Sequence, residues 1–116
     1  MATYVASNRS TSHRTRREVA VIFDREYGEL FIHDTDLILI DGQWVTDTVK
    51  TIQLNFSDIV EVEFRGYHNE GDDRFKIDLH TKEKAYHIPV DDLENMMDLY
   101  TMITREVDIY KKEDAE

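Results

Sequence analysis

Apolar and polar residues alternate along most of the chain between Glu18 and Ile88, and this period of two predicts β-strands. The predicted strands are EVAVIF (18–23), GELFIH (28–33), LILI (37–40), TVKTIQLNF (48–56), IVEVEF (59–64), FKIDLH (75–80) and AYHI (85–88). Asp41-Gly42 suits a tight hairpin turn, and RGYHNEGDD (65–73) reads as a polar loop. The pattern therefore predicts about seven antiparallel strands.

The alternation also indicates which side chains face the core. With Lys82-Glu83 as a two-residue turn, the last hairpin has three opposite pairs: Asp78 with His87, Leu79 with Tyr86, and Ile77 with Ile88. Its predicted core face is then Phe75, Ile77, Leu79, Tyr86 and Ile88. On IVEVEF the same rule directs Val60, Val62 and Phe64 inward, and Glu61 and Glu63 outward.

A helix is predicted after Pro89, over residues 91–112. Pro89 cannot donate to a strand ladder, so we expect the sheet to end there. Asp91 and Glu94 have the spacing of a capping box. At 100° per residue one apolar stripe forms, made of Leu93, Met96, Met97, Tyr100, Ile103, Val107 and Tyr110.

Two apolar residues of this helix fall outside the stripe. Met102 and Ile109 lie seven positions apart, hence on one line, among charged neighbours. They are either scattered exposed residues of the ordinary kind, or a contact for another protein or for a second copy of the chain.

Composition narrows the class of protein. A chain of 116 residues fits one domain, and the absence of cysteine excludes disulfides, thiolate metal sites and thiol catalysis and favours an intracellular compartment. No apolar run approaches the roughly 18 residues of a membrane span, and the start lacks the order of a secretory signal. We therefore expect a cytoplasmic protein.

Charge is unevenly distributed along the chain. There are 14 basic and 25 acidic residues, a net charge of −11. Residues 1–17 hold Arg9, Arg14, Arg16 and Arg17 and no acid, so residues 18–116 carry 10 bases against 25 acids, or −15. We expect residues 1–17 to be a flexible basic arm and residues 18–116 to be the domain. The acidic domain disfavours nucleic acid or anionic lipid as the main ligand.

The candidate chemical groups have plainer alternatives. His80, His87 and Asp78 on the last hairpin could bind a metal ion, but a solvated Asp-His pair is the favoured interpretation. Glu61 and Glu63 could hold a cation, but solubility is the favoured role. No nucleophile has an assigned base. The sequence therefore predicts no catalytic residue, no metal site and no cofactor.

A family resemblance is carried by three stretches: Gly28-x-Leu30-x-Ile32, then Asp36-Leu37-x-Leu39, then Ile52-x-Leu54-x-x-x-Asp58-Ile59-x-x-Val62. With a final helix, this order over about residues 18–112 resembles the pleckstrin-homology-like superfold, and GRAM-type domains most closely. The resemblance implies a mainly β barrel of about seven antiparallel strands capped by one C-terminal α-helix. Members of that superfold bind phosphoinositides, peptides or whole proteins, and few are enzymes.

One departure bears on the ligand. Lipid-binding members place Lys and Arg around the first hairpin loop, whereas the matching residues here are Asp24, Arg25, Glu26, Tyr27 and Glu29. The sequence therefore predicts a non-enzymatic protein-interaction or adaptor module, with Met102, Ile109, Arg9, Arg14, Arg16 and Arg17 as partner-binding residues. Three alternatives stay open: a membrane headgroup-binding module, a nucleic-acid-binding protein that uses the arm, and a small hydrolase with an unrecognised carboxylate site.

Overall fold

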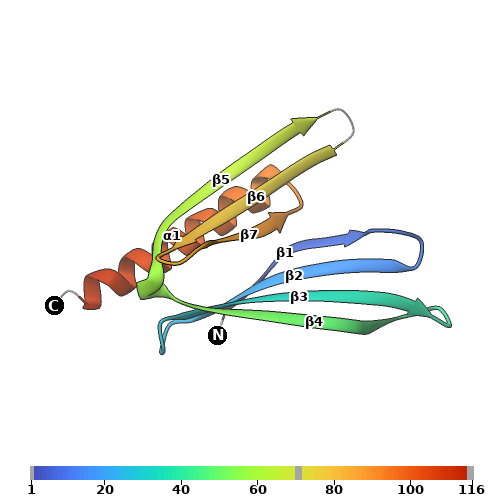
Figure 1. Ribbon diagram of the computed structural model, residues 1–116, viewed down its shortest axis with the longest axis horizontal. Helices are drawn as coiled ribbons and strands as arrows, with labels where there is room; N and C mark the ends of the chain where they lie inside the picture. The colour runs from blue at the N-terminus through green and yellow to red at the C-terminus, as the bar shows by residue number, and fades with distance from the viewer. Residues whose placement is uncertain (1, 70–71, 115–116) are drawn as a thin grey trace.

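The computed structural model describes residues 2–69 and 72–114, which form two antiparallel sheets and one long helix (Figure 1). The first sheet has the order β1 (Ala2–Ser10), β2 (Thr15–Asp24), β3 (Glu29–Ile40) and β4 (Gln43–Asn55). The short 3-10 helix η1 (Phe56–Asp58) leads into the second sheet, β5 (Ile59–Asn69), β6 (Asp72–Thr81) and β7 (Ala85–Val90). The helix α1 (Leu93–Asp114) follows.

The predicted class, mainly β with one C-terminal helix, is confirmed, and the arrangement is compatible with a pleckstrin-homology-like sandwich. The predicted closed barrel is corrected: over the described residues the strands form two separate sheets. The edge strands β1 and β7 meet through one backbone bond, in which Asp91 N–H donates to Ala6 O at 3.1 Å. By alternation the next residue of β7 facing β1 is Pro89, which has no N–H to continue the pairing.

The chain before Glu18 differs from its prediction as a flexible arm. Residues 2–10 form β1, which pairs with β2 from Ala2 opposite Phe23 to Ser10 opposite Arg16. The expected boundary between residues 1–17 and 18–116 therefore falls inside β2. The strand is held by partners more than 80 positions away in the sequence, such as Asp91, and local composition gives no sign of such contacts.

Strand lengths also differ from the prediction. The stretches 28–33 and 37–40 belong to one strand, β3, because the acids between them are paired across the sheet: Arg17 bonds Asp34, and Thr48 Oγ1 donates to Asp36 at 2.9 Å. The predicted loop over 65–73 is largely taken up by strand, since β5 runs to residue 69 and β6 begins at residue 72. Residues 70 and 71 lie outside the described residues.

A β-bulge changes the predicted facing of β5. Ile59 pairs with Thr81 and Glu61 with His80, so Val60 is the extra residue. Ile59 is buried in the core, whereas Val60, predicted to face inward, is 56 % exposed. Beyond the bulge the outward direction predicted for Glu61 follows from its pairing with His80.

The register of the last hairpin is confirmed. Asp78 lies opposite His87, Leu79 opposite Tyr86 and Ile77 opposite Ile88. The sheet continues one residue past Pro89, which is compatible with an edge strand whose missing N–H faces away from β6.

The helix begins slightly later than predicted and is turned relative to the predicted stripe. Asp92 caps it, accepting the Asn95 N–H at 2.8 Å, while Asp91 binds β1 instead. The fully buried helix residues include Leu99, whereas Met97 is 40 % exposed. No helix within the described residues is long and apolar enough to cross a membrane.

The core lies between the inner faces of the sheets and the helix. Its buried apolar side chains come from every β-strand and from α1, and include Val21, Phe23, Leu30, Ile77, Leu79, Ile88, Met96, Leu99 and Ile103. At the far end of α1, Tyr110 packs against Phe56 and covers Gly28 so closely that an added Cβ would lie 2.4 Å from its ring. Gly28 also has a φ of 65°, so this turn requires glycine.

The contact between β1 and α1 yields a stability prediction. Tyr4 Oη lies 3.1 Å from Asn95 O and 3.0 Å from Asn95 Oδ1, and burial, followed by Asp98 and other helix acids, raises the pKa of Tyr4 above 10.0. Tyr4→Phe should lower the free energy of unfolding by about 1 kcal/mol at neutral pH. Because the folded-state pKa is raised, the stability from Tyr4 is full below pH 10 and is lost as pH rises further. The deficit of the variant should therefore shrink in alkaline urea titrations.

The matched control is Tyr27→Phe, since Tyr27 is 68 % exposed. That variant should match the wild type at every pH. A Tyr4→Phe deficit that stays constant from neutral to alkaline pH would contradict the assignment.

Candidate functional site

A cleft of about 570 Å³ opens where β1 and β7 separate. Figure 1 shows the end of β7 beside the middle of β1, where Asp91 N–H bonds Ala6 O, with the sheets diverging beyond that point. Pro89, which has no N–H to offer a neighbouring strand, is itself one of the lining residues. The lining residues come from β1 and the turn after it, β2, β6 and β7, and are Ser7, Arg9, Ser10, Thr11, Arg17, Phe75, Lys76, His87, Pro89 and Val90.

The walls of the cleft concentrate cationic groups in an acidic chain. Arg9, Arg17 and Lys76 line it together with His87, and no carboxylate is among the lining residues. Acids stand immediately behind: Asp91 binds Arg9, Asp34 binds Arg17, and Asp78 Oδ1 lies 2.5 Å from His87 Nδ1. Three groups of the lining are thus held by ion pairs, and the carboxylates that hold them are not among the lining residues.

Asp91 organises one wall. Its carboxylate accepts from the Asn8 N–H at 3.0 Å, from Ser7 Oγ at 3.1 Å and from Arg9 Nε at 2.8 Å. Arg9 Nη2 also donates to Asp91 O at 2.8 Å. This single residue therefore fixes both the end of β7 and the path of β1.

Arg17 stands beside Arg9 on the same wall, as its cross-strand neighbour on β2. Its Nε and Nη2 donate to Asp34 at 2.9 and 2.7 Å. The hydrogen bond to Asp34 raises the pKa of Arg17, outweighing the opposite effect of partial burial. The guanidinium therefore stays cationic at every physiological pH and is held in a defined orientation.

The predicted partner-binding arginines divide into two pairs. Arg9 and Arg17 line the cleft. Arg14 lies in the exposed turn between β1 and β2, and Arg16 stacks on Trp44 with its Cζ 4.8 Å from the ring centroid. Arg9 and Arg17 are cross-strand neighbours, so alternation along β1 and β2 explains the division.

The predicted helix residues also separate. Met102 is partly buried and packs against the core, contrary to its predicted outward position, because the buried stripe includes Leu99 and Ile103. Ile109 is 42 % exposed. Neither belongs to the lining of the cleft.

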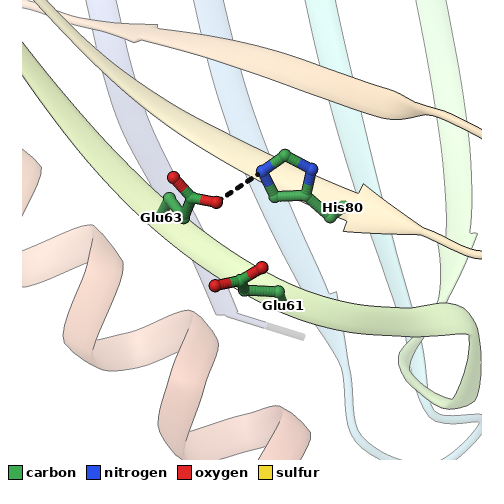
Figure 2. Close-up of side chains that lie close together, drawn as sticks. All are labelled: Glu61, Glu63 and His80. Carbon is green, nitrogen blue, oxygen red and sulfur yellow. Dashed lines mark ion pairs between the residues drawn. The ribbon is translucent and has the colours of Figure 1, made fainter.

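A second cluster lies on the outer face of the β5–β6 hairpin (Figure 2). Glu61, Glu63 and His80 have ligand atoms that all lie within 4.8 Å of one another. His80 Nε2 is 3.0 Å from Glu63 Oε1. The favoured interpretation of Asp78 and His87 as a cross-strand pair agrees with their contact, and Arg65 Nε also lies 3.0 Å from Asp78. The disfavoured metal cluster of His80, His87 and Asp78 is not among the groups of possible metal ligands within the described residues.

Sequence reasoning missed Lys76 and His87 as cleft residues and the pairing of Glu61 with His80. The alternation does place Glu61, Glu63 and His80 on outward faces. Their meeting depends on the register between β5 and β6, which the bulge at Val60 sets and which no local pattern indicates.

Comparison of the chain with protein-family models, curated proteins and solved structures found no match.

The role of Asp91 can be tested by Asp91→Ala. Loss of its contacts to β1 should lower the free energy of unfolding by about 1 to 3 kcal/mol and remove hydrogen-exchange protection from the Asn8 amide. Asp47→Ala, on the exposed edge of β4, is the matched control and should change little. Equal effects of the two substitutions would contradict the role of Asp91.

The two helix residues can be told apart by the same kind of measurement. Met102→Asp should lower the free energy of unfolding by about 2 kcal/mol or more, because the new carboxylate would replace a side chain packed on the core. Ile109→Asp should change it by about 0.5 kcal/mol or less. Urea denaturation followed by circular dichroism measures both. A stable Met102→Asp protein would show that Met102 is free of the core.

Proposed function

We propose that this chain is a non-enzymatic protein-interaction module of the adaptor type, which captures a short acidic segment of a partner protein in the cleft between β1 and β7. The supporting observation is the cationic lining of that cleft, Arg9, Arg17 and Lys76, in a chain of net charge −11. Guanidinium groups held in a fixed orientation suit carboxylates, which they can bind through paired N–H donors.

The size of the ligand separates a peptide from larger polyanions. At physiological ionic strength, screening limits the reach of electrostatic repulsion from the acidic surface to about 8 Å. A short segment bound in the cleft therefore interacts mainly with the charges of the lining. A membrane surface or a nucleic acid extends past the cleft and meets the acidic body of the protein. These considerations favour a protein partner.

The first hairpin loop gives a second reason to prefer a protein-interaction role over a headgroup-binding role. The basic residue of the loop, Arg25, forms a bidentate ion pair with Glu106 of α1. Asp24 Oδ1 accepts the backbone N–H groups of Glu26 and Tyr27. The loop is thus committed to the fold, and its remaining charges are acidic.

The helix contributes less to the proposed interface. Met102 packs on the core, so self-association through the predicted outer line would depend on Ile109. We place the partner-binding surface in the cleft, the protein in the cytoplasm, and its ancestry among GRAM-like members of the pleckstrin-like superfold.

The test measures fluorescence anisotropy of a labelled Glu-rich peptide, with a Gln-rich peptide of equal length as its neutral counterpart. The wild type should bind the acidic peptide only, with affinity falling as salt rises. Lys76→Gln and Arg17→Gln should each weaken binding about fivefold or more, since a charge-assisted contact contributes about 1 kcal/mol or more.

Arg14→Gln is the matched control, because Arg14 belongs to the same basic stretch but does not line the cleft. It should leave the affinity unchanged. Phosphatidylserine vesicles and a single-stranded oligonucleotide are tested in parallel. Tighter binding of either one, or equal effects of Arg14→Gln and Lys76→Gln, would overturn the proposal.

A further inference from the structure

We infer that Glu61, Glu63 and His80 form a binding site for a divalent transition metal ion, with Zn²⁺ as the preferred ion. The site lies on the outer face of β5 and β6 and shares no residue with the cleft, so it stands independently of the proposed function. It also departs from the sequence-based expectation of no metal site.

The donor set favours this class of ion. Two carboxylates and one imidazole suit Zn²⁺, whose bonds to nitrogen and oxygen are about 2.0–2.2 Å long. Ca²⁺ and Mg²⁺ prefer sites made of oxygen alone. Three protein ligands also leave one position open for water or another donor, as is common at zinc sites that remain accessible.

The geometry is close to that of a bound ion. Tetrahedral bonds of about 2.1 Å place neighbouring ligand atoms roughly 3.4 Å apart. His80 Nε2 and Glu63 Oε1 are already 3.0 Å apart, and all the ligand atoms lie within 4.8 Å. The remaining adjustment falls on Glu61, an exposed side chain that can move by rotating its own bonds.

An unsatisfied atom gives independent support. His80 Nε2 is buried and makes no hydrogen bond within the described residues, although Glu63 Oε1 lies at ion-pair distance. Buried polar atoms are normally hydrogen-bonded, and this nitrogen has an ion-pair contact with Glu63 but no hydrogen bond, so a metal ion would supply the missing bond. A cation would also offset the repulsion between Glu61 and Glu63.

The backbone explains how these residues meet. The bulge at Val60 brings Glu61 directly opposite His80, while Glu63 follows two positions later on the same face. In Figure 2 the three side chains gather above the two strands that carry them. Because paired strands fix all three backbone positions, little ordering is needed to form the site.

The experiment is a calorimetric titration of the tag-free full-length chain with ZnCl₂, repeated with CoCl₂, CaCl₂ and MgCl₂. Zn²⁺ and Co²⁺ should each bind at one ion per chain, and the visible absorption of Co²⁺ should report four or five ligands. His80→Gln and Glu61→Gln should each weaken Zn²⁺ binding roughly tenfold or more. Excess Ca²⁺ or Mg²⁺ should not displace Zn²⁺.

Two controls keep the result specific. His13→Gln replaces a histidine of the exposed turn after β1 and should leave Zn²⁺ affinity unchanged. Circular dichroism should show that every variant folds, and histidine NMR signals should locate the ion at His80. Absence of saturable binding, unchanged affinity in His80→Gln, displacement by Ca²⁺, or NMR shifts confined to other histidines would each overturn the inference.

Discussion

The two sheets are joined in two places, and their arrangement depends most on the non-covalent contacts of Asp91. The covalent connection runs from β4 through η1 into β5. On the other side, the Asp91 backbone bonds Ala6, and its carboxylate bonds Ser7, Asn8 and Arg9. These contacts attach the outermost strand of the first sheet to the junction of β7 and α1. Apart from these contacts and its packing on α1, β1 is an edge strand that pairs only with β2, with few apolar residues to hold it.

The contacts of Asp91 also mark where the cleft between the two sheets begins. The backbone bond from Asp91 N–H to Ala6 O comes just after the end of β7, and β1 continues beyond it to Ser10. Past this point Arg9 and Arg17 extend the inner face of the first sheet, where Val19 and Val21 face the core. One face of one sheet thus changes from apolar core to charged cleft wall within a few residues.

Sequence pattern predicted the elements that local alternation controls. The β6–β7 register followed from a short turn and matched apolar positions such as Ile77 and Ile88, and the helix followed from its apolar period and Pro89. Long-range features were not accessible in this way. β1 depends on Asp91, and the division of β5 into inward and outward residues depends on one bulge at Val60. Both features are set by pairing partners, and a single-sequence period carries no information about partners.

The candidate site was predicted in part for the same reason. The sequence singled out the arginines of residues 1–17 as a group, whereas strand alternation sends Arg9 and Arg17 into the cleft and Arg16 to the opposite face. Lys76 joins them from a distant hairpin that composition could not connect to this stretch.

Structural use of these cations also limits how tightly the cleft can bind. Asp34 occupies Nε and Nη2 of Arg17, and Asp91 occupies Nε and Nη2 of Arg9. A guanidinium has five N–H donors, so Arg9 and Arg17 can each bind a second anion. Each would still share its charge with the carboxylate that it already binds. A ligand therefore gains oriented donors without the full attraction of a free cation. This favours a weak, readily reversible complex of the kind proposed above over tight capture of a multivalent phosphate.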